Sequence, residues 1–119
     1  MLVDDDDDLR EIMSDVLTEH GYDVAEAGDG ATAMALLQRG PPLPQLILLD
    51  LVLPDCDGFE FRERQLADRK LADIPVIVLS GAGDIAAISR VLRVTGYLQK
   101  PFEPRVLLAT VERHARAEG

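Results

Sequence analysis

The chain has 119 residues, 47% of them hydrophobic, and a formal net charge of −10. This length supports one hydrophobic core, which predicts a single domain over residues 1–119. A strongly acidic chain repels phosphate backbones and anionic lipids, so the charge argues against direct binding of nucleic acid or membrane. Cys56 is the only cysteine, which excludes an intrachain disulfide, and the first residues lack a signal-peptide pattern. We therefore expect a cytoplasmic protein whose partners are other proteins or metal ions.

The first half of the chain predicts two strand–helix units. Residues 1–3 form an apolar run before Asp4, and apolar residues recur at helical spacing over 9–20. The run DVAEA at 23–27 predicts a second strand. A Gly-Asp-Gly turn then leads to a predicted helix over 31–38, which ends before a glycine and two prolines.

The second half repeats this alternation three times. The unbroken apolar run LILLD at 46–50 suits a parallel strand that is covered on both faces. The alternation predicts a flavodoxin-like, doubly wound α/β fold, with five helices and a five-stranded parallel sheet in the order 2-1-3-4-5. The other expected elements are helices over 59–71, 84–94 and 103–117, and strands over 75–80 and 96–100.

Polar side chains follow the predicted strands at their carboxyl ends. Asp4 and Asp5 follow the first strand, Asp50 the third, Ser80 the fourth and Lys100 the fifth. In this strand order the first and third strands are neighbours, so their acids meet at one crevice. Clustered carboxylates repel one another unless a divalent cation neutralises them, and Mg²⁺ prefers such oxygen ligands. With a lysine facing them, these residues predict a site for a metal ion and a phosphoryl group.

Plainer readings stay open for several of these residues. A run of consecutive acids is usually a solvated surface, and we interpret Asp6, Asp7 and Asp8 as charges at the start of a helix. Lys100 also suits a simple ion pair with Asp50, which is compatible with a role in phosphoryl binding. His20, His114 and Cys56 are expected to have no catalytic role.

Four segments occur in the order of the motifs of one known family. They are VDDDDDLRE, DLVLPDCDGFE, IPVIVLSG and YLQKPF. They resemble the acidic start, the phosphorylated-aspartate segment, the hydroxyl strand and the lysine-proline pair of the receiver domain of two-component response regulators, in the CheY-like superfamily. The resemblance covers nearly the whole chain, and it implies a domain that takes up a phosphoryl group and signals.

The resemblance also implies roles for the acidic residues and the lysine. Asp50 would be the phosphoacceptor, and Lys100 would contact the phosphoryl group. Asp5, Asp50 and the backbone carbonyl of Val52 would bind Mg²⁺, for which Mn²⁺ can substitute. Asp4 would act through a water on the metal.

Two further residues would form the switch. Ser80 would contact the phosphoryl group, and Tyr97 would swing inward when that hydroxyl engages the phosphate. The same resemblance implies a cis peptide bond between Lys100 and Pro101.

The implied partners are a sensor histidine kinase or a phosphotransfer protein. The phosphorylated domain would signal to a partner or output domain through the face of the fourth helix, fifth strand and fifth helix, and the same face could support a homodimer. Such a domain is a phosphoacceptor switch with at most self-phosphorylation and autodephosphorylation activity. The sequence does not distinguish a stand-alone receiver from one excised from a longer regulator.

Two other function classes are alternatives. A phosphorylation-independent pseudo-receiver would keep the fold but lose site residues, whereas all five strand-end residues are present here. A metal-dependent phosphohydrolase of the haloacid dehalogenase type needs an aspartate two residues after the nucleophile, and that position is Val52. Val52 and Ala82 offer no acid or amide to orient a water, which predicts slow autodephosphorylation.

Two of the departures from the family pattern concern the second half of the chain. The segment from Ser80 to Lys100 is about two residues shorter than we expect, which affects the fourth helix and the placement of Tyr97. Arg62 and Gln65 occupy helix positions where aliphatic residues are expected. The third helix is therefore expected to pack loosely.

Overall fold

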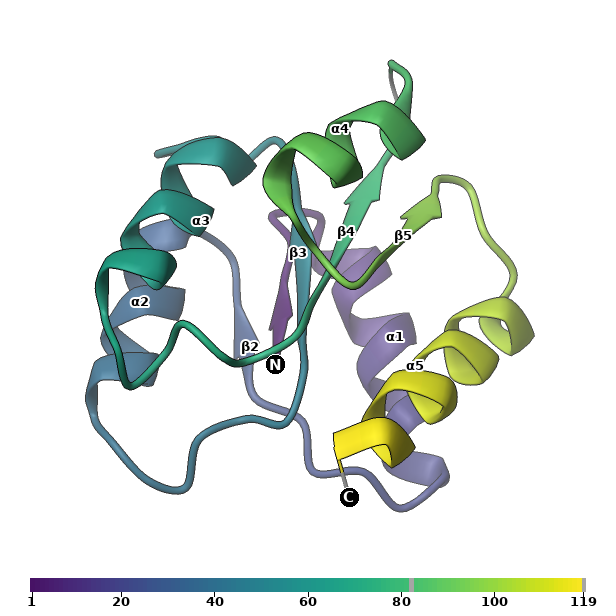
Figure 1. The fold of residues 1–119 in the computed structure, drawn as a ribbon. Coiled ribbons are helices and arrows are strands. Elements are labelled where there is room, and N and C mark those ends of the chain that lie inside the picture. The colour runs from purple at the N-terminus through teal and green to yellow at the C-terminus, as the bar shows by residue number, and fades with distance from the viewer. Residues whose placement is uncertain (82, 119) are drawn as a thin grey trace.

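Five short strands form one parallel sheet in the order β2-β1-β3-β4-β5 (Figure 1). The computed structural model describes residues 1–81 and 83–118. This order confirms the predicted flavodoxin-like topology and places β1 beside β3 at the centre of the sheet. The strands are β1 Leu2–Val3, β2 Glu26–Ala27, β3 Ile47–Asp50, β4 Val76–Ser80 and β5 Gly96–Gln99.

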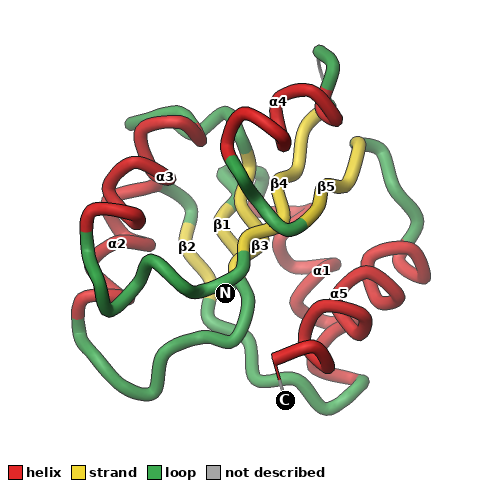
Figure 2. Tube along the Cα trace, in the orientation of Figure 1, coloured by secondary structure: helices red, strands yellow, loops and turns green. Residues whose placement is uncertain are grey.

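Helices cover both faces of the sheet (Figures 1 and 2). α1 and α5 lie on one face, and α2, α3 and α4 lie on the other. Within the described ranges, no helix is both long and apolar enough to cross a bilayer. The helices are α1 Asp7–Glu19, α2 Gly30–Gln38, α3 Gly58–Ala67, α4 Ile85–Leu92 and α5 Pro104–Glu118.

Strands β3 and β4 are buried along their whole length. Alternate side chains of β3 and β4 point to opposite faces, as the strand period of two requires. Ile47, Leu49 and Val78 pack with α2, α3 and α4, while Leu48 and Ile77 pack with α1 and α5. Burial on both faces explains why these segments are unbroken apolar runs.

An aspartate caps the amino-terminal end of each of the first four helices. In each case the carboxylate accepts the backbone N–H three residues ahead, at 2.6–3.1 Å. Such caps stabilise a helix by about 1 kcal/mol each, and their negative charge also interacts favourably with the helix dipole. Part of the net charge of −10 is therefore structural, which confirms the reading of the Asp6–Asp8 run as helix-start charges. The four capping residues are Asp6, Asp29, Asp57 and Asp84.

Helix α3 ends four residues earlier than the sequence pattern predicts. The pattern continues to Leu71, but the helix ends at Ala67. Asp68 has an extended backbone and accepts the N–H of Lys70 with its own side chain at 2.9 Å. A separate turn follows, closed by the Ala72 N–H on the Asp68 carbonyl. Aspartate favours such local bonds over continued helix, and Leu71 reaches the core from the turn.

Arg62 and Gln65 do not loosen α3, contrary to our expectation, because both are buried in a hydrogen-bonded network. Arg62 donates to the carbonyls of Leu92 and Arg93 at 3.1 and 3.0 Å, and to Oε1 of Gln65 at 2.7 Å. These carbonyls lie at the carboxyl end of α4, where the helix dipole is negative. Burial lowers the pKa of the Arg62 guanidinium. The amide of Gln65 donates in turn to two carbonyls of the α3–β4 segment, at 2.9 Å each.

Candidate functional site

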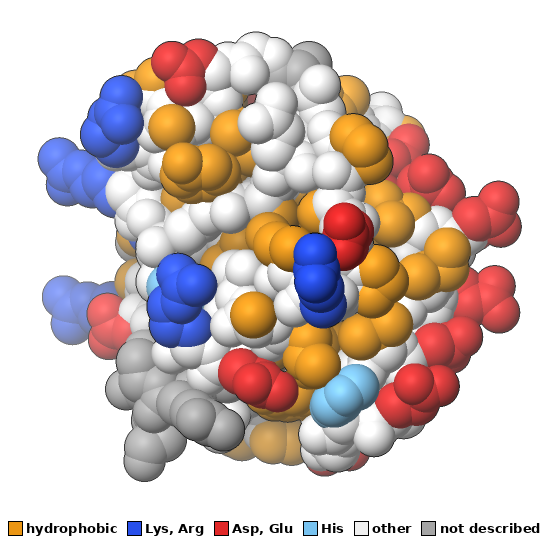
Figure 3. Space-filling model, turned by 90° about the vertical axis from the view of Figure 1, so that its right-hand side faces the viewer, with side chains coloured by type: hydrophobic (Ala, Val, Ile, Leu, Met, Phe, Trp, Pro, Cys, Tyr) orange, Lys and Arg blue, Asp and Glu red, His pale blue; other side chains and the backbone are white. Residues whose placement is uncertain are grey.

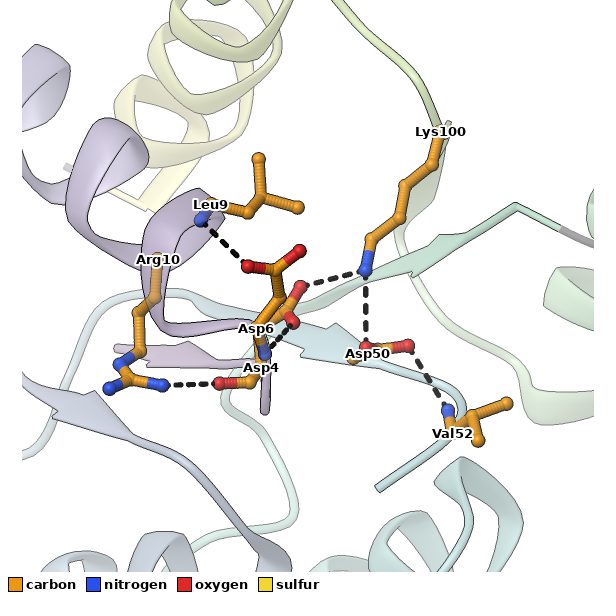
Figure 4. Close-up of polar contacts among 7 residues, drawn as sticks. All are labelled: Asp4, Asp6, Leu9, Arg10, Asp50, Val52 and Lys100. Carbon is orange, nitrogen blue, oxygen red and sulfur yellow. Dashed lines mark hydrogen bonds and ion pairs between the residues drawn. The ribbon is translucent and has the colours of Figure 1, made fainter. Parts of the chain in front are cut away.

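Three of the predicted site residues, Asp4, Asp50 and Lys100, gather at the carboxyl edge of the sheet (Figure 4). Asp4 follows β1, Asp50 ends β3, and Lys100 follows β5. Because β1 pairs with β3, the two aspartates lie close together, and the side chain of Lys100 reaches both from the other side of β4. The structure therefore brings together the acids and the lysine that the strand-end pattern singled out.

Lys100 forms ion pairs with both buried aspartates. Its Nζ lies 2.9 Å from Oδ2 of Asp4 and 3.1 Å from Oδ2 of Asp50. The remaining oxygens accept backbone N–H groups, from Asp6 on Asp4 at 2.9 Å and from Val52 on Asp50 at 3.1 Å. One ammonium thus faces two carboxylates whose positions are fixed by the backbone.

Burial and mutual repulsion both disfavour the charged form of the carboxyl groups in this cluster. Burial raises the pKa of Asp50, and the neighbouring Asp4 carboxylate adds to this, whereas the N–H of Val52 and the charge of Lys100 act against it. Burial alone would lower the pKa of Lys100, but its contacts with Asp4 and the charges of Asp4 and Asp50 outweigh burial and raise it. Three carboxyl groups thus gather around one ammonium, which relieves their mutual repulsion only in part.

The oxygen donors fit a small divalent cation. One carboxylate oxygen from each of Asp4, Asp5 and Asp50 lies within 4.8 Å of the others. Among the described residues, the buried Oδ2 of Asp4 has no partner in hydrogen-bond geometry, only the nearby Lys100 ammonium. Asp5 is exposed, which leaves that side open to water. An all-oxygen set that is partly open to water suits Mg²⁺, which keeps several waters when proteins bind it.

Ser80 and Tyr97 lie in different environments. Ser80 is buried at the end of β4, and its carbonyl accepts the N–H of Lys100 at 2.8 Å. Tyr97 pairs with Val78 in the sheet, and its side chain is 46% exposed. The structure thus places Ser80 at the acidic edge and Tyr97 on the surface, and the peptide bond between Lys100 and Pro101 is cis, as expected.

Helix α4 is short, and a tight turn connects it to β5. The helix ends at Leu92, and Arg93 then adopts the left-handed conformation with a φ of 57°. The N–H of Val94 bonds to the Ser89 carbonyl, and that of Thr95 to Val76. This tight turn leads directly into β5, which pairs in register with β4.

Val52 and Ala82 are the two residues that offer no acid or amide to orient an attacking water; Val52 has a described position, whereas Ala82 lies outside the described residues. Val52 is 71% exposed in the loop that follows Asp50. Its side chain therefore borders the site from the solvent side without contributing a polar group.

Asp55 is a residue that sequence reasoning missed. Its two carboxylate oxygens accept the N–H groups of Gly30 and Ala31, at 2.8 Å each, and so join the β3–α3 loop to the start of α2. These two hydrogen bonds lower the pKa of Asp55. A lone acid in a loop carries no sequence signal for partners 25 residues away.

The Asp55→Asn variant is expected to be less stable than the native chain at neutral pH, because an amide presents one acceptor oxygen instead of two. The folded-state pKa of Asp55 lies below its ordinary value of 3.8, so this stabilisation is present above that value and disappears as pH falls further. Urea unfolding at several pH values would show the difference narrowing under acid conditions. A constant difference at all pH values would contradict the assignment.

The sequence and structure match known proteins over nearly the whole chain. A family model described as "Response regulator receiver domain" matches residues 1–112. The chain is 37% identical to the DNA-binding dual master transcriptional regulator RpaA of Synechocystis sp., over 93% of this chain and 46% of that protein. It is 35% identical to the phosphate regulon transcriptional regulatory protein PhoB of Pseudomonas aeruginosa, over 100% of this chain and 52% of that protein. The chain thus spans about half the length of these curated relatives.

Solved structures show the same architecture. The chemotaxis protein CheY4 of Vibrio cholerae superposes with a TM-score of 0.85 and 30% identity, over 95% of this chain and 94% of that chain. The receiver domain of NtrX from Brucella abortus gives a TM-score of 0.85 and 26% identity, over 97% and 96% of the two chains. With the strand order 2-1-3-4-5 and the acidic edge, these matches show that the chain belongs to the response regulator receiver domain family.

Proposed function

We propose that this chain is a phosphorylation-switched signalling domain, over residues 1–119, that accepts a phosphoryl group on Asp50. The donor would be a sensor histidine kinase or a phosphotransfer protein of the cytoplasm. The observation that carries the proposal is the placement of Asp50 at the end of a central buried strand, 3.1 Å from the Lys100 ammonium and beside Asp4. An exposed or isolated aspartate would have neither a lysine ammonium nor a second carboxylate beside it.

The chemistry follows from these positions. A carboxylate oxygen of Asp50 would attack the phosphorus of the donor, the bond from phosphorus to the donor atom would break, and an acyl phosphate would form. Negative charge spreads over the phosphoryl oxygens during transfer, so positioning and neutralisation dominate catalysis. Lys100 would exchange its hydrogen bond with Asp50 and its ion pair with Asp4 for contact with a phosphoryl oxygen, and Ser80 would donate its hydroxyl hydrogen to another.

A divalent cation completes this assignment. Asp5, Asp50 and the Val52 carbonyl would hold Mg²⁺ or Mn²⁺, with Asp4 reaching it through a water. The cation would supply neutralising charge at the edge where the acids gather. The exposed position of Asp5 leaves its carboxylate accessible to an incoming ion.

The bound phosphoryl group would act as the signal. It adds a charge of about −1.5 to −2, which we expect to reorganise Ser80, Tyr97 and the α4–β5–α5 face. Tyr97 on β5 and Val106 on α5 are 46% and 43% exposed. Figure 3 shows hydrophobic side chains over the middle of the face that carries α5, between an acidic edge and a basic edge. This surface suits contact with a partner, an output domain or a second copy.

The proposal is tested by metal-dependent phosphorylation. We would incubate the chain with a small acyl phosphate donor in the presence of Mg²⁺, Mn²⁺ or a chelator, and follow the intact mass. One phosphoryl group is expected with either cation and none with the chelator. A pseudo-receiver would show no adduct and no affinity for Mg²⁺, whereas a phosphohydrolase would release phosphate continuously without accumulating an adduct.

The phosphoryl group is expected to persist well beyond seconds once formed. No acid or amide is present at Val52 or Ala82 to orient an attacking water, so hydrolysis would proceed with little assistance. Removing the donor and following the adduct by intact mass measures the lifetime. Decay within seconds would contradict this expectation, and a Val52→Asn variant is expected to decay faster than the native chain.

A further inference from the structure

Arg10 lies on the side of Asp4 opposite Lys100 (Figure 4). It belongs to the first turn of α1, and its Nη1 donates to the backbone carbonyl of Asp4 at 2.6 Å. Its Nη2 donates to the carboxylate of Asp7 at 2.7 Å, and its Nε lies 3.3 Å from Oε1 of Glu26 on β2. One guanidinium therefore joins the end of β1, the start of α1 and β2.

With this contact, every polar group of Asp4 has a neighbour that fixes it. The Asp4 N–H donates to the Ala27 carbonyl at 3.1 Å, and its carbonyl accepts from Arg10. Oδ1 accepts the N–H of Asp6, and Oδ2 lies beside Lys100. Asp4 is fully buried. If Arg10 were removed, the Asp4 carbonyl would lose its hydrogen-bond donor, and water could not readily replace it.

The carbonyl of Asp4 belongs to the same planar peptide group as the N–H of Asp5. A donor that fixes the orientation of this carbonyl therefore also fixes the orientation of the Asp4–Asp5 peptide plane, which contains the backbone nitrogen of Asp5. Asp5 is exposed and supplies one of the three clustered carboxylate oxygens. Its direction therefore depends on the orientation of the preceding peptide.

We infer that Arg10 is a positioning residue for the metal site, which orients the Asp4–Asp5 peptide and so sets the spacing between the Asp5 and Asp50 carboxylates. The inference rests on the proposed function, because it concerns the same cation site. Groups that orient metal ligands without touching the ion typically change metal affinity by about 10–100-fold when they are removed. The planar fork of arginine can donate to the Asp4 carbonyl and the Asp7 carboxylate while its charge pairs with Glu26, a geometry that the point charge of lysine does not reproduce.

A role in positioning and a role through charge alone predict opposite changes in Mg²⁺ affinity when Arg10 is removed. A cation near the site repels Mg²⁺, so by charge alone Arg10 would weaken metal binding, and its removal would tighten it. If Arg10 positions the ligands, its removal weakens binding. The Arg10→Lys variant keeps the charge and removes the fork, which separates the two effects.

We would measure the dissociation constant for Mg²⁺ by calorimetry at fixed ionic strength, for the native chain and for Arg10→Lys, Arg10→Gln and Glu26→Gln. Arg39→Gln, at an exposed position at the end of α2, serves as the control for loss of one positive charge. Both Arg10 variants are expected to bind Mg²⁺ about 10-fold more weakly or worse. Glu26→Gln leaves the bond to Asp4 in place and is expected to change affinity little.

Three results would overturn the inference. Unchanged affinity in Arg10→Lys with tighter binding in Arg10→Gln would assign Arg10 to charge alone. Native affinity in both variants would make Arg10 a purely structural residue. If the native chain itself bound no Mg²⁺, the proposed function would fail and the inference with it, whereas the first two results leave the proposed function intact. Thermal unfolding of each variant identifies any that does not fold, and Arg10→Lys, the smaller change, then decides the outcome.

Discussion

The Lys100→Met variant is expected to accept a phosphoryl group about 10²–10³-fold more slowly than the native chain, while it still binds Mg²⁺. Methionine keeps an unbranched side chain but removes the ammonium, which lies 2.9 and 3.1 Å from the two buried aspartates. In enzymes, loss of one preorganised donor to developing charge has a cost of this size. The phosphorylation rate is measured from the intact mass of samples that are quenched at successive times after an acyl phosphate donor is added.

Retained metal binding makes this prediction specific. Without Lys100, only the cation would neutralise Asp4 and Asp50, so Mg²⁺ affinity is expected to hold or to increase. The chain has one other lysine, Lys70, whose exposed side chain lies in the turn after α3, and Lys70→Met is the matched control. Native phosphorylation rates in Lys100→Met would refute a role for the ammonium. Equal losses in both variants would point to a general effect of removing positive charge.

In the metal-free Lys100→Met chain, the contribution of Asp50 to the free energy of unfolding is also expected to decrease as pH rises through the acid range. The pKa of Asp50 is already raised by burial, and loss of Lys100 removes a charge that lowers it. A carboxyl with a raised folded-state pKa favours the folded state when protonated. This contribution is therefore lost as pH rises above 3.8, the ordinary value, toward the folded-state pKa.

The Arg62→Met variant is expected to lose about 2–3 kcal/mol of folding stability, because it leaves buried acceptors without a donor. The guanidinium serves the Leu92 and Arg93 carbonyls and Gln65, and none of these bonds can be made by methionine. Relief of the desolvation of Arg62 offsets part of the loss. Urea unfolding at equilibrium gives the change in free energy of unfolding.

Arg64 provides the control for Arg62. It lies two residues further along α3 with an exposed side chain, so Arg64→Met is expected to change stability by less than about 0.5 kcal/mol. Hydrogen exchange should show the loss in Arg62→Met concentrated at the carboxyl end of α4. A stability equal to that of the native chain would mean that apolar packing replaces the network fully.

The sheet and the centre of the site were predictable because both depend on short-range patterns. β3 and β4 are buried on both faces, which requires unbroken apolar runs such as LILLD and PVIVLS. In a parallel sheet the residues that end such runs meet at one edge, and the ion pairs of Lys100 with Asp4 and Asp50 follow from that geometry. Family resemblance then supplied the roles of the individual residues.

The polar contacts between distant segments were not predictable in this way. The carbonyl partners of Arg62 lie 30 and 31 residues further along the chain, and the partners of Asp55 lie 25 and 24 residues before it. A charged residue in a helix pattern predicts solvent exposure, and nothing in the local sequence reveals a buried carbonyl that can satisfy it. The contact of Arg10 with the Asp4 carbonyl was missed for the same reason, because the acceptor is backbone and leaves no trace in residue type.

The assignment of Asp50 as phosphoacceptor is tested most directly by the intact mass of three proteins treated with Mg²⁺ and a small acyl phosphate donor. They are the native chain, Asp50→Asn, and Asp15→Asn, which alters an exposed aspartate on α1. The native chain and Asp15→Asn are expected to gain one phosphoryl group, and Asp50→Asn none. A phosphoryl group on Asp50→Asn, or its absence from all three, would contradict the proposed function.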